Sequence, residues 1–151
     1  MQIKGSRFLV IGGAGFIGSH LVDQLLGQGA ELVRVYDNFS RGSLGTLSKA
    51  KENPKCKIFG LDEDVRDRHI LFKAIEGVDG VFRLAALWLL HCVEFPRSAF
   101  HTNIEGTFDV LELCVNSNVS CVKEAANTIG FQAYINLESG LNELLEWKRS
   151  V

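Results

Sequence analysis

The glycine-rich stretch FLVIGGAGFIGSHLV, from Phe8 to Val22, decides the fold of this chain. Its first four residues form an unbroken apolar run, as in a parallel strand that is buried on both faces. Gly12, Gly15 and Gly18 follow, and after them apolar residues recur at helical spacing. A strand, a glycine-rich turn and a helix in this order indicate a site for the phosphates of a nucleotide.

The three glycines have separate expected roles. Gly12 permits a tight turn, Gly15 lets a pyrophosphate approach the backbone, and Gly18 lets the helix lie close to the strand. The free N–H groups and the positive dipole end of that helix would then face the phosphates. Glycines also cluster in ordinary turns, so the alternative is a glycine-rich turn in a sheet that binds no nucleotide.

Asp37 indicates which nucleotide is bound. It follows a second apolar run, residues 32–36, and therefore ends the second predicted strand. A carboxylate at that point can accept hydrogen bonds from both hydroxyls of the adenine ribose, and it would repel a 2′-phosphate. NAD is therefore expected as the cofactor in preference to NADP. Arg34 and Arg41 are the residues that could reverse this preference.

The rest of the chain continues the alternation of strands and helices. Further strands are predicted at residues 57–59 and 81–85, with a loop at 37–55 that has room for a short helix. Asp67 can cap a helix that runs to about residue 76 and is closed by a glycine. This order predicts an α/β fold, a Rossmann-type parallel sheet with strand order 3-2-1-4, flanked by helices on both faces.

A long helix, 96–116, follows the fourth strand and is opened by Pro96. One of its faces is apolar, and periodicity favours a place for this face in the core over a partner surface. The run Trp88-Leu89-Leu90 is expected to form an exposed apolar patch. The apolar face of the long helix comprises Phe100, Ile104, Phe108, Leu111 and Val115.

Composition excludes several classes of function. The net charge of -2 argues against nucleic-acid binding. The four cysteines and four histidines show neither C-x-x-C nor ligand spacing, so reduced thiols and no metal site are expected. The longest apolar run, 84–92, is too short to cross a membrane, and no signal peptide precedes the first strand. A cytoplasmic protein without a membrane or nucleic-acid partner is expected.

Most of the chain resembles the extended short-chain dehydrogenase/reductases, specifically the NAD-dependent sugar-nucleotide epimerases and dehydratases. The matching runs are GGAGFIGSH at the glycines, VYDNFSRG after the second strand, DEDVRD after the third, GVDGVFRLAA at the fourth and EFPRSAFHTNIEGTFDVLELC in the long helix. Together they cover nearly all of residues 8–114. One departure is Arg83, where the family often has His.

The resemblance implies roles for further residues. Asn38 would contact the adenosine, and Asp64 and Val65 would hold the adenine. A short segment after the fourth strand would line the path toward the nicotinamide, and Asn103, from the family's N-x-x-G-T helix, would lie near the cofactor pocket. The expected cofactor site comprises Gly12, Gly15, Phe16, Ile17, Gly18, Asp37, Asn38, Ser40, Arg41, Asp64, Val65, Leu84, Ala85, Ala86 and Asn103.

The catalytic pair of this family is not found. The family uses Tyr-x-x-x-Lys, in which Lys lowers the pKa of the phenol, together with a Ser or Thr on a fifth strand. In this chain Tyr36 is followed four positions later by Ser40, and Tyr134 by Glu138. A carboxylate raises the pKa of a neighbouring phenol, so neither pair has the required chemistry. No catalytic residue is expected, and the chain alone is not expected to be an enzyme.

Residues 117–151 resemble the extreme C-terminus of the family, where a Gly-aromatic turn and a segment like SLEEGL…EW close the substrate domain. The chain is therefore interpreted as an epimerase-like protein with an internal deletion around residues 116–122, and not as a shortened fragment. It is expected to be a single NAD-binding domain, 1–151, with its cofactor-binding core at 1–116. The tail is expected to contain a brief strand at 133–135 and a C-terminal helix.

Three functions remain open on the sequence. The first is an NAD(H)-binding module without its own catalysis. The second is an NAD-dependent sugar-nucleotide epimerase or dehydratase completed by a partner subunit, and the third is a non-enzymatic interaction or regulatory protein. A homodimer is expected, through the edge of the fourth strand or through the long helix 96–116, because exposed strand edges are normally covered and relatives in the family pair through that helix.

Overall fold

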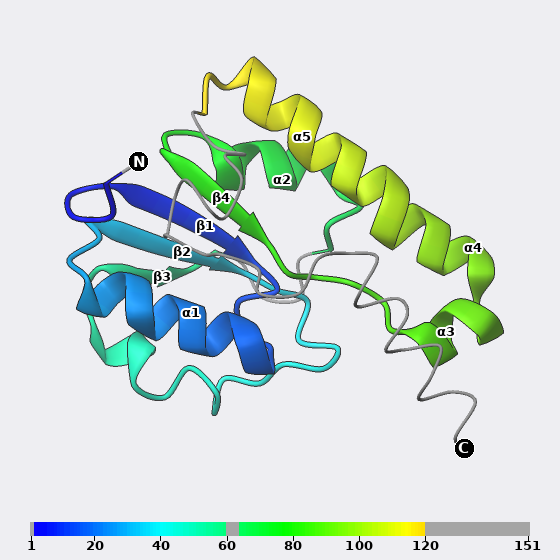
Figure 1. Cartoon of the computed structure of the whole chain (residues 1–151), viewed down its shortest axis with the longest axis horizontal. Coiled ribbons are helices and arrows are strands. Elements are labelled where there is room, and N and C mark those ends of the chain that lie inside the picture. The colour runs from blue at the N-terminus through cyan, green and yellow to red at the C-terminus, as the bar shows by residue number, and fades with distance from the viewer. Residues whose placement is uncertain (1, 60–63, 120–151) are drawn as a thin grey trace, which may run out of the picture. The chain divides into compact units, whose positions relative to one another are not determined.

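A four-stranded parallel sheet forms the centre of the computed structural model, which describes residues 2–59 and 64–119 (Figure 1). The strand order is β3-β2-β1-β4, as predicted from the sequence. The strands are β1 (Arg7–Ile11), β2 (Leu32–Tyr36), β3 (Cys56–Ile58) and β4 (Gly80–Arg83). The fourth strand ends before the predicted residue 85, but the N–H groups of Leu84 and Ala85 still donate to the carbonyl of Ile11, at 2.7 and 3.0 Å.

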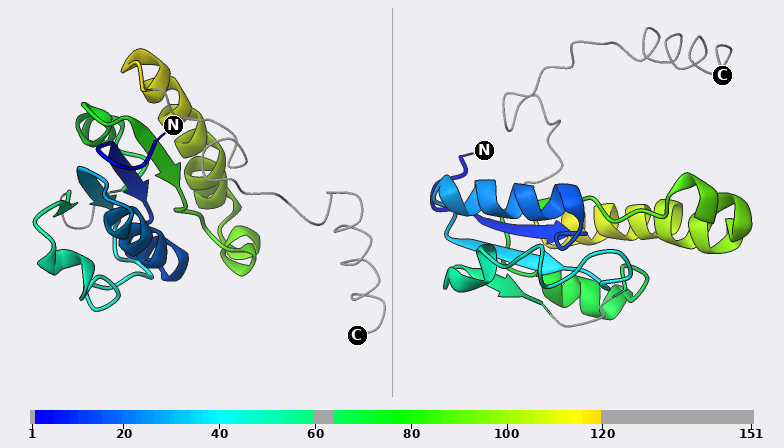
Figure 2. Two further views of the ribbon diagram at one scale, coloured as in Figure 1. Left: turned by 60° about the vertical axis from the view of Figure 1, so that its left-hand side comes forward. Right: turned by 90° about the horizontal axis from the view of Figure 1, so that it is seen from below.

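Helices cover both faces of the sheet, which confirms the predicted layers. Helix α1 (Phe16–Gly27) lies on one face, and α2 (Arg68–Ile75) and α5 (Gly106–Asn116) lie on the other (Figure 2). Because strand side chains alternate, Phe8 and Val10 face α1 while Leu9 and Ile11 face the core beneath α2 and α5. All four side chains are at most 1% exposed, so β1 is buried on both faces.

The helix ends follow their sequence signals. The Asp67 carboxylate accepts hydrogen bonds of 3.1 Å from the N–H groups of His69 and Ile70 and thereby caps α2. Gly29 and Gly77, just beyond α1 and α2, have φ of +85° and +72°, the left-handed conformation typical of a residue that ends a helix. The loop after β2 contains one short helix, η1 (Ala50–Glu52), as expected.

The segment that follows β4 is more helical than predicted. A short helix, α3 (Leu89–Glu94), precedes the long one, and its residues are exposed or half-buried. The long helix begins at Pro96 as predicted, but it is composed of α4 (Pro96–Ala99), a π-helical segment η2 (Phe100–Glu105) and α5. The predicted strand 133–135 and the C-terminal helix lie outside the described residues.

The apolar face predicted to lie in the core is instead exposed. Phe100, Ile104, Phe108, Leu111 and Val115, here called the outer stripe, are 40% to 76% exposed. A second face of the same helix is buried and packs in one core cluster with Leu9 and Ile11 of β1. A Cβ at Gly106 would lie 3.1 Å from the Val65 side chain. The buried residues of this second face are Ala99, Gly106, Val110, Leu113 and Cys114.

The prediction that the outer stripe lies in the core was wrong because both faces of the long helix have residues at helical spacing. Periodicity identifies residues that share a face, but it does not show which face meets the sheet. The outer stripe carries the larger and more hydrophobic side chains, yet the other face is the one that the structure buries. The run Trp88-Leu89-Leu90, in contrast, is 45% to 76% exposed, as predicted.

Candidate functional site

Two of the three glycines have no room for a side chain. Gly12 has φ of +82°, and a Cβ on it would lie 2.5 Å from the backbone nitrogen of Ala85. A Cβ on Gly18 would lie 2.1 Å from the carbonyl oxygen of Gly12, so only glycine lets α1 approach the loop this closely. Among the described residues outside its own segment, the nearest atom to a Cβ on Gly15 would be that same carbonyl oxygen, at 3.3 Å. Gly15 also lines the cavity at this end of the sheet, so a ligand there can approach its backbone.

The first turn of α1 presents unused hydrogen-bond donors. Gly15 is the N-cap residue and provides no capping side chain, and the first turn contains no acidic residue. Within the described residues, no acceptor is bonded to the backbone N–H groups of Phe16, Ile17 or Gly18. Together with the positive end of the helix dipole, these donors suit an anionic group.

A cavity of about 790 Å³ opens in front of this loop, at the carboxyl ends of β1, β2 and β4. In an open parallel sheet ligands bind at this point. The chain adds β2 and β3 on one side of β1 and β4 on the other, which leaves a crevice between β1 and β4. Every residue of the predicted cofactor site lines the cavity except Asn103. The predicted residues in the lining are Gly12, Gly15, Phe16, Ile17, Gly18, Asp37, Asn38, Ser40, Arg41, Asp64, Val65, Leu84, Ala85 and Ala86.

Asp37 faces the glycine loop from the end of β2. Its Oδ2 atom accepts a hydrogen bond from the Ala14 N–H at 2.9 Å, and its Oδ1 atom accepts one from the Phe39 N–H at 2.8 Å. Each carboxylate oxygen has further lone pairs, so both oxygens can still accept hydrogen bonds from a ligand. The carboxylate is thus oriented by backbone groups before any ligand arrives.

The two arginines that could reverse the nucleotide preference are differently placed. Arg34 donates to the carbonyls of Ala74 and Glu76, at 2.8 and 2.6 Å, near the end of α2. Burial lowers the pKa of its guanidinium. Arg34 is not among the cavity residues, whereas Arg41 lines the cavity and its guanidinium lies 4.8 Å from the ring centroid of Trp88.

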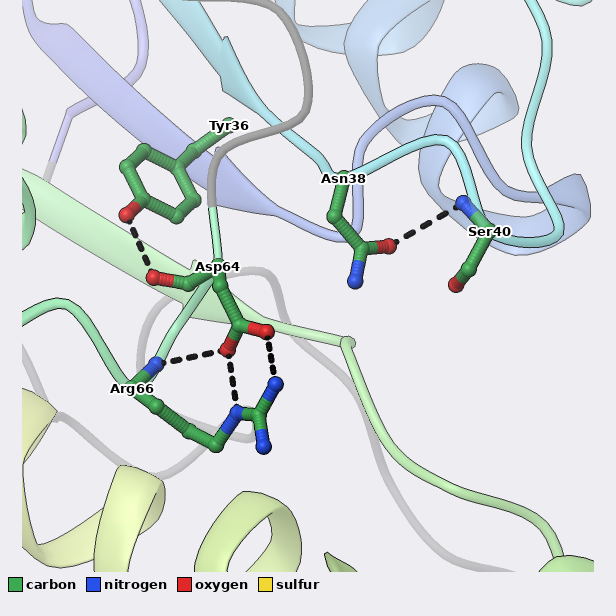
Figure 3. A network of polar contacts seen from close by, with 5 residues as sticks. All are labelled: Tyr36, Asn38, Ser40, Asp64 and Arg66. Atoms are coloured by element: carbon green, nitrogen blue, oxygen red, sulfur yellow. Dashed lines mark hydrogen bonds and ion pairs between the residues drawn. The ribbon is translucent and has the colours of Figure 1, made fainter.

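Polar contacts connect several residues that line the cavity (Figure 3). The Tyr36 hydroxyl donates to the carbonyl of Asp64 at 2.7 Å, and the Asp64 carboxylate accepts bonds from the backbone and the guanidinium of Arg66. Hydrogen bonding to Arg66 lowers the pKa of Asp64 although burial opposes it, so this carboxylate is anionic at neutral pH. Asn38 accepts a bond from the Ser40 N–H at 3.1 Å, and its amide nitrogen points away from Ser40.

Asn103 does not line the cavity but forms hydrogen bonds with the backbone of a residue that does. Its Oδ1 atom accepts a hydrogen bond from the Leu87 N–H at 2.8 Å, and its Nδ2 atom donates to the Leu87 carbonyl at 2.9 Å. Leu87 itself lines the cavity. Asn103 therefore positions the segment that follows β4, a role that the sequence did not predict.

Several lining residues were not predicted. A Cβ on Gly42 would lie 2.6 Å from the carbonyl oxygen of Ala14, so this glycine brings the loop after β2 against the glycine loop. Four others, His91, Phe95, Ser98 and Thr102, are spaced three or four residues apart, from α3 through the cap residue Phe95 to α4 and η2. The unpredicted lining residues are Ile11, Tyr36, Gly42, Arg66, Leu87, His91, Phe95, Ser98 and Thr102.

Arg83, the departure noted from the sequence, lies outside the cavity lining. Its guanidinium donates to the carbonyl of Thr102, which joins β4 to η2. Burial lowers the pKa of Arg83, and its buried Nε atom has no hydrogen-bond partner within the described part of the chain.

The described segments offer no metal centre and no membrane span. None of their His, Cys, Asp and Glu side chains form a group of three or more that could hold a metal ion. None of their helices combines the length and the hydropathy needed to cross a bilayer.

The fold and the cavity are those of the short-chain dehydrogenase/reductase superfamily, whose cofactor-binding domains are of Rossmann type. Residues 9–125 match the 3-beta hydroxysteroid dehydrogenase/isomerase family. The chain belongs to this family. The family and the NAD-dependent epimerases and dehydratases are part of the same superfamily, the short-chain dehydrogenase/reductases.

Curated relatives and solved structures agree with this assignment. The chain is 37% identical over 111 residues to UDP-glucuronic acid decarboxylase 1 of Arabidopsis thaliana, covering 73% of this chain and 24% of the relative. It is 29% identical over 150 residues to the human sterol-4-alpha-carboxylate 3-dehydrogenase, decarboxylating, covering 95% of this chain and 35% of that protein. The structure resembles DesIV, a dTDP-glucose 4,6-dehydratase from Streptomyces venezuelae solved with NAD and TYD bound.

The match to DesIV has a TM-score of 0.69 at 32% sequence identity and covers 75% of this chain and 37% of DesIV. The chain thus spans between about a quarter and about two fifths of the length of these three proteins.

Proposed function

We propose that this chain is an NAD(H)-binding domain that has no catalysis of its own. The observation that carries the proposal is the backbone at Gly15 in the cavity lining, where the N–H groups of Phe16, Ile17 and Gly18 have no acceptor within the described residues. A pyrophosphate at this point would accept those hydrogen bonds. NAD bound to DesIV, a structural relative at 32% identity, supports the choice of ligand.

The ADP half of the cofactor is expected to be held more firmly than the nicotinamide half. Asp37 would accept hydrogen bonds from the adenine ribose, and Asp64 and Val65 would contact the adenine. Arg34 is engaged at the end of α2 and cannot serve a 2′-phosphate there, which supports NAD over NADP. The nicotinamide half would lie along Leu84, Ala86 and Phe95, which are apolar, exposed residues of the cavity lining.

The absence of catalysis is proposed from the two tyrosines. Tyr36 is 1% exposed and its hydroxyl donates to the carbonyl of Asp64, so it is a structural residue. Tyr134 lies outside the described residues, and Glu138 stands where the family's Lys would be. The alternative is an NAD-dependent sugar-nucleotide epimerase or dehydratase in which a partner subunit supplies Tyr and Lys. A second alternative is an interaction or regulatory protein whose nucleotide only stabilises the fold.

A homodimer is part of this proposal, and the outer stripe supports it. Five large apolar side chains on one helix face are more than an isolated surface usually exposes together. Sedimentation velocity of wild type and of Phe108→Lys tests this point, with Leu89→Lys as the control, because Leu89 is 76% exposed but lies on α3. A monomeric wild type, or a dimer that Phe108→Lys leaves intact, would contradict the dimer through the long helix.

Calorimetric titration of the whole chain with NAD, NADH and NADP tests the cofactor. We expect saturable binding of NAD and weaker binding of NADP. The same preparations are then assayed with UDP- and dTDP-sugars for turnover. Turnover by the chain alone would overturn the absence of catalysis, turnover only with an added partner would favour the partner-completed enzyme, and no binding at millimolar nucleotide would favour the interaction protein.

A further inference from the structure

Arg41 and Trp88 form a contact between the two segments that border the glycine loop. Arg41 follows β2 and Trp88 follows β4, and these strands flank β1 in the sheet. The guanidinium carbon lies 4.8 Å from the centroid of the indole ring, within the range of a cation–π interaction. The indole N–H of Trp88 donates to Nδ1 of His91 at 2.7 Å, which orients the ring from its other edge.

Both segments are held directly against the glycine loop. A Cβ on Gly42, the residue after Arg41, would lie 2.6 Å from the Ala14 carbonyl oxygen. On the other side, the backbone of Ala85 lies so close to Gly12 that a Cβ there would meet it at 2.5 Å. Arg41 and Trp88 therefore extend from backbone segments that contact the loop, and Arg41 lines the same cavity as Gly15.

The charges of the cavity single out Arg41. Asp37 and Asp64 provide its carboxylates, and Arg66 is bound to Asp64 by two guanidinium contacts. Within the described part of the chain, Arg41 forms no ion pair, and its one recorded side-chain contact is with Trp88. A pyrophosphate at the glycine loop would lie in a cavity that also contains the Asp37 carboxylate, and a cation there would offset part of the repulsion between the two. Guanidinium groups suit phosphate oxygens because they can donate two parallel hydrogen bonds.

We propose that Arg41 binds the pyrophosphate of the cofactor and that Trp88 positions it, so that the pair closes over the phosphates as a strap between the ends of β2 and β4. This inference rests on the proposed function, since it concerns the same cavity. Stacking on the indole restricts a long and otherwise exposed side chain to the region of the loop. Less conformational freedom is then lost when the phosphate binds.

Calorimetry with ADP and with adenosine, which lacks phosphates, tests the role of Arg41. Arg41→Ala is expected to weaken ADP and NAD about tenfold or more, as for a lost hydrogen bond to a charged group, and to leave adenosine unchanged. Arg97→Ala is the matched control, because Arg97 is an exposed arginine that does not line the cavity. Equal losses for ADP and adenosine, or no loss for ADP, would overturn the proposal.

A double-mutant cycle tests whether Trp88 acts through Arg41. Trp88→Leu is expected to weaken ADP in the wild-type background but not in the Arg41→Ala background, and Trp88→Phe is expected to retain most of the affinity. An undiminished effect of Trp88→Leu without Arg41 would show that the indole ring has another role. In a Trp147→Phe background, ADP should change the fluorescence of Trp88 and adenosine should not, and equal responses would also overturn the strap.

The two proposals fail in different ways. If folded wild-type protein binds neither NAD nor ADP, both the proposed function and the strap are wrong. If wild type binds NAD more tightly than NADP but Arg41→Ala binds both nucleotides as wild type does, the strap alone is wrong.

Discussion

The Oδ2 atom of Asp37 accepts a 2.9 Å hydrogen bond from the backbone N–H of Ala14, so the residue that ends β2 also holds the glycine loop. Its Oδ1 atom accepts a second backbone bond, from Phe39, a residue with φ of 53°. Asp37 therefore has a structural role in addition to the ligand-binding role proposed for it. A loss of affinity after its substitution has two physical sources.

We accordingly expect Asp37→Ala to lower both the affinity for NAD and the stability of the protein. Two backbone N–H groups would lose their acceptor, which costs about 1 to 3 kcal/mol when water cannot fully replace it. Thermal unfolding of the ligand-free variant measures the structural part. The ligand part is measured on wild type alone, by comparing NAD with its 2′-deoxyadenosine analogue. A variant that unfolds at the wild-type temperature would show that the bond to Ala14 is not structural.

Gly12→Ala is expected to destabilise the fold strongly. The new methyl group would require φ of +82° and would meet the backbone of Ala85 at 2.5 Å. The two effects together cost about 2 to 4 kcal/mol. Gly27→Ala is the control, because a Cβ there meets nothing within 4 Å and alanine favours the helix. Urea unfolding of both variants measures the difference, and equal midpoints would contradict the loop geometry.

The assignment of the two faces of the long helix can be tested with one substitution at two positions. Leu113→Ala is expected to cost about 2 to 4 kcal/mol because the side chain is 5% exposed and its removal leaves a cavity. Leu111→Ala, two residues away, is expected to cost less than about 1 kcal/mol because that side chain is 40% exposed. Unfolding at low protein concentration, where a dimer would dissociate, provides the comparison. The reverse order would restore the assignment of the outer stripe to the core.

The bond between Asp64 and Arg66 predicts a pH dependence of stability. Hydrogen bonding to Arg66 lowers the pKa of Asp64 in the folded state, so the folded protein holds this proton less tightly than the unfolded chain does. The resulting stability is present above the unfolded pKa of about 3.9 and is lost as the pH falls through the lower, folded value.

Arg66→Gln is therefore expected to be less stable than wild type near pH 7, by at most about 1 kcal/mol since Arg66 is half exposed. The difference should shrink as the pH falls below about 4. Urea unfolding at pH 7 and pH 3 checks both values. A constant or growing difference at low pH would mean that the effect of Arg66 is not electrostatic.

Local sequence patterns were sufficient for the sheet, the glycine loop and Asp37. The family resemblance supplied the further predicted site residues Asn38, Asp64, Val65, Leu84, Ala85, Ala86 and Asn103. The apolar run before Gly12 predicts β1, and the acid after the second run places Asp37 at the end of β2. Parallel strands of this kind have a restricted set of connections, so the order β3-β2-β1-β4 follows from chirality and topology. Residues that end strands or begin helices meet at one edge of such a sheet, which explains why the predicted residues share one cavity.

Only the tertiary structure decided the relationships that depend on distance between segments. The long helix has two apolar faces with the same spacing, and only the packing of Val110, Leu113 and Cys114 in the core shows which face is buried. The meeting of Arg41 with Trp88 and the support of Leu87 by Asn103 join residues far apart in the chain. Local patterns determine strands, turns and caps because these depend on neighbouring residues, whereas side-chain contacts between segments depend on packing, which no local pattern contains.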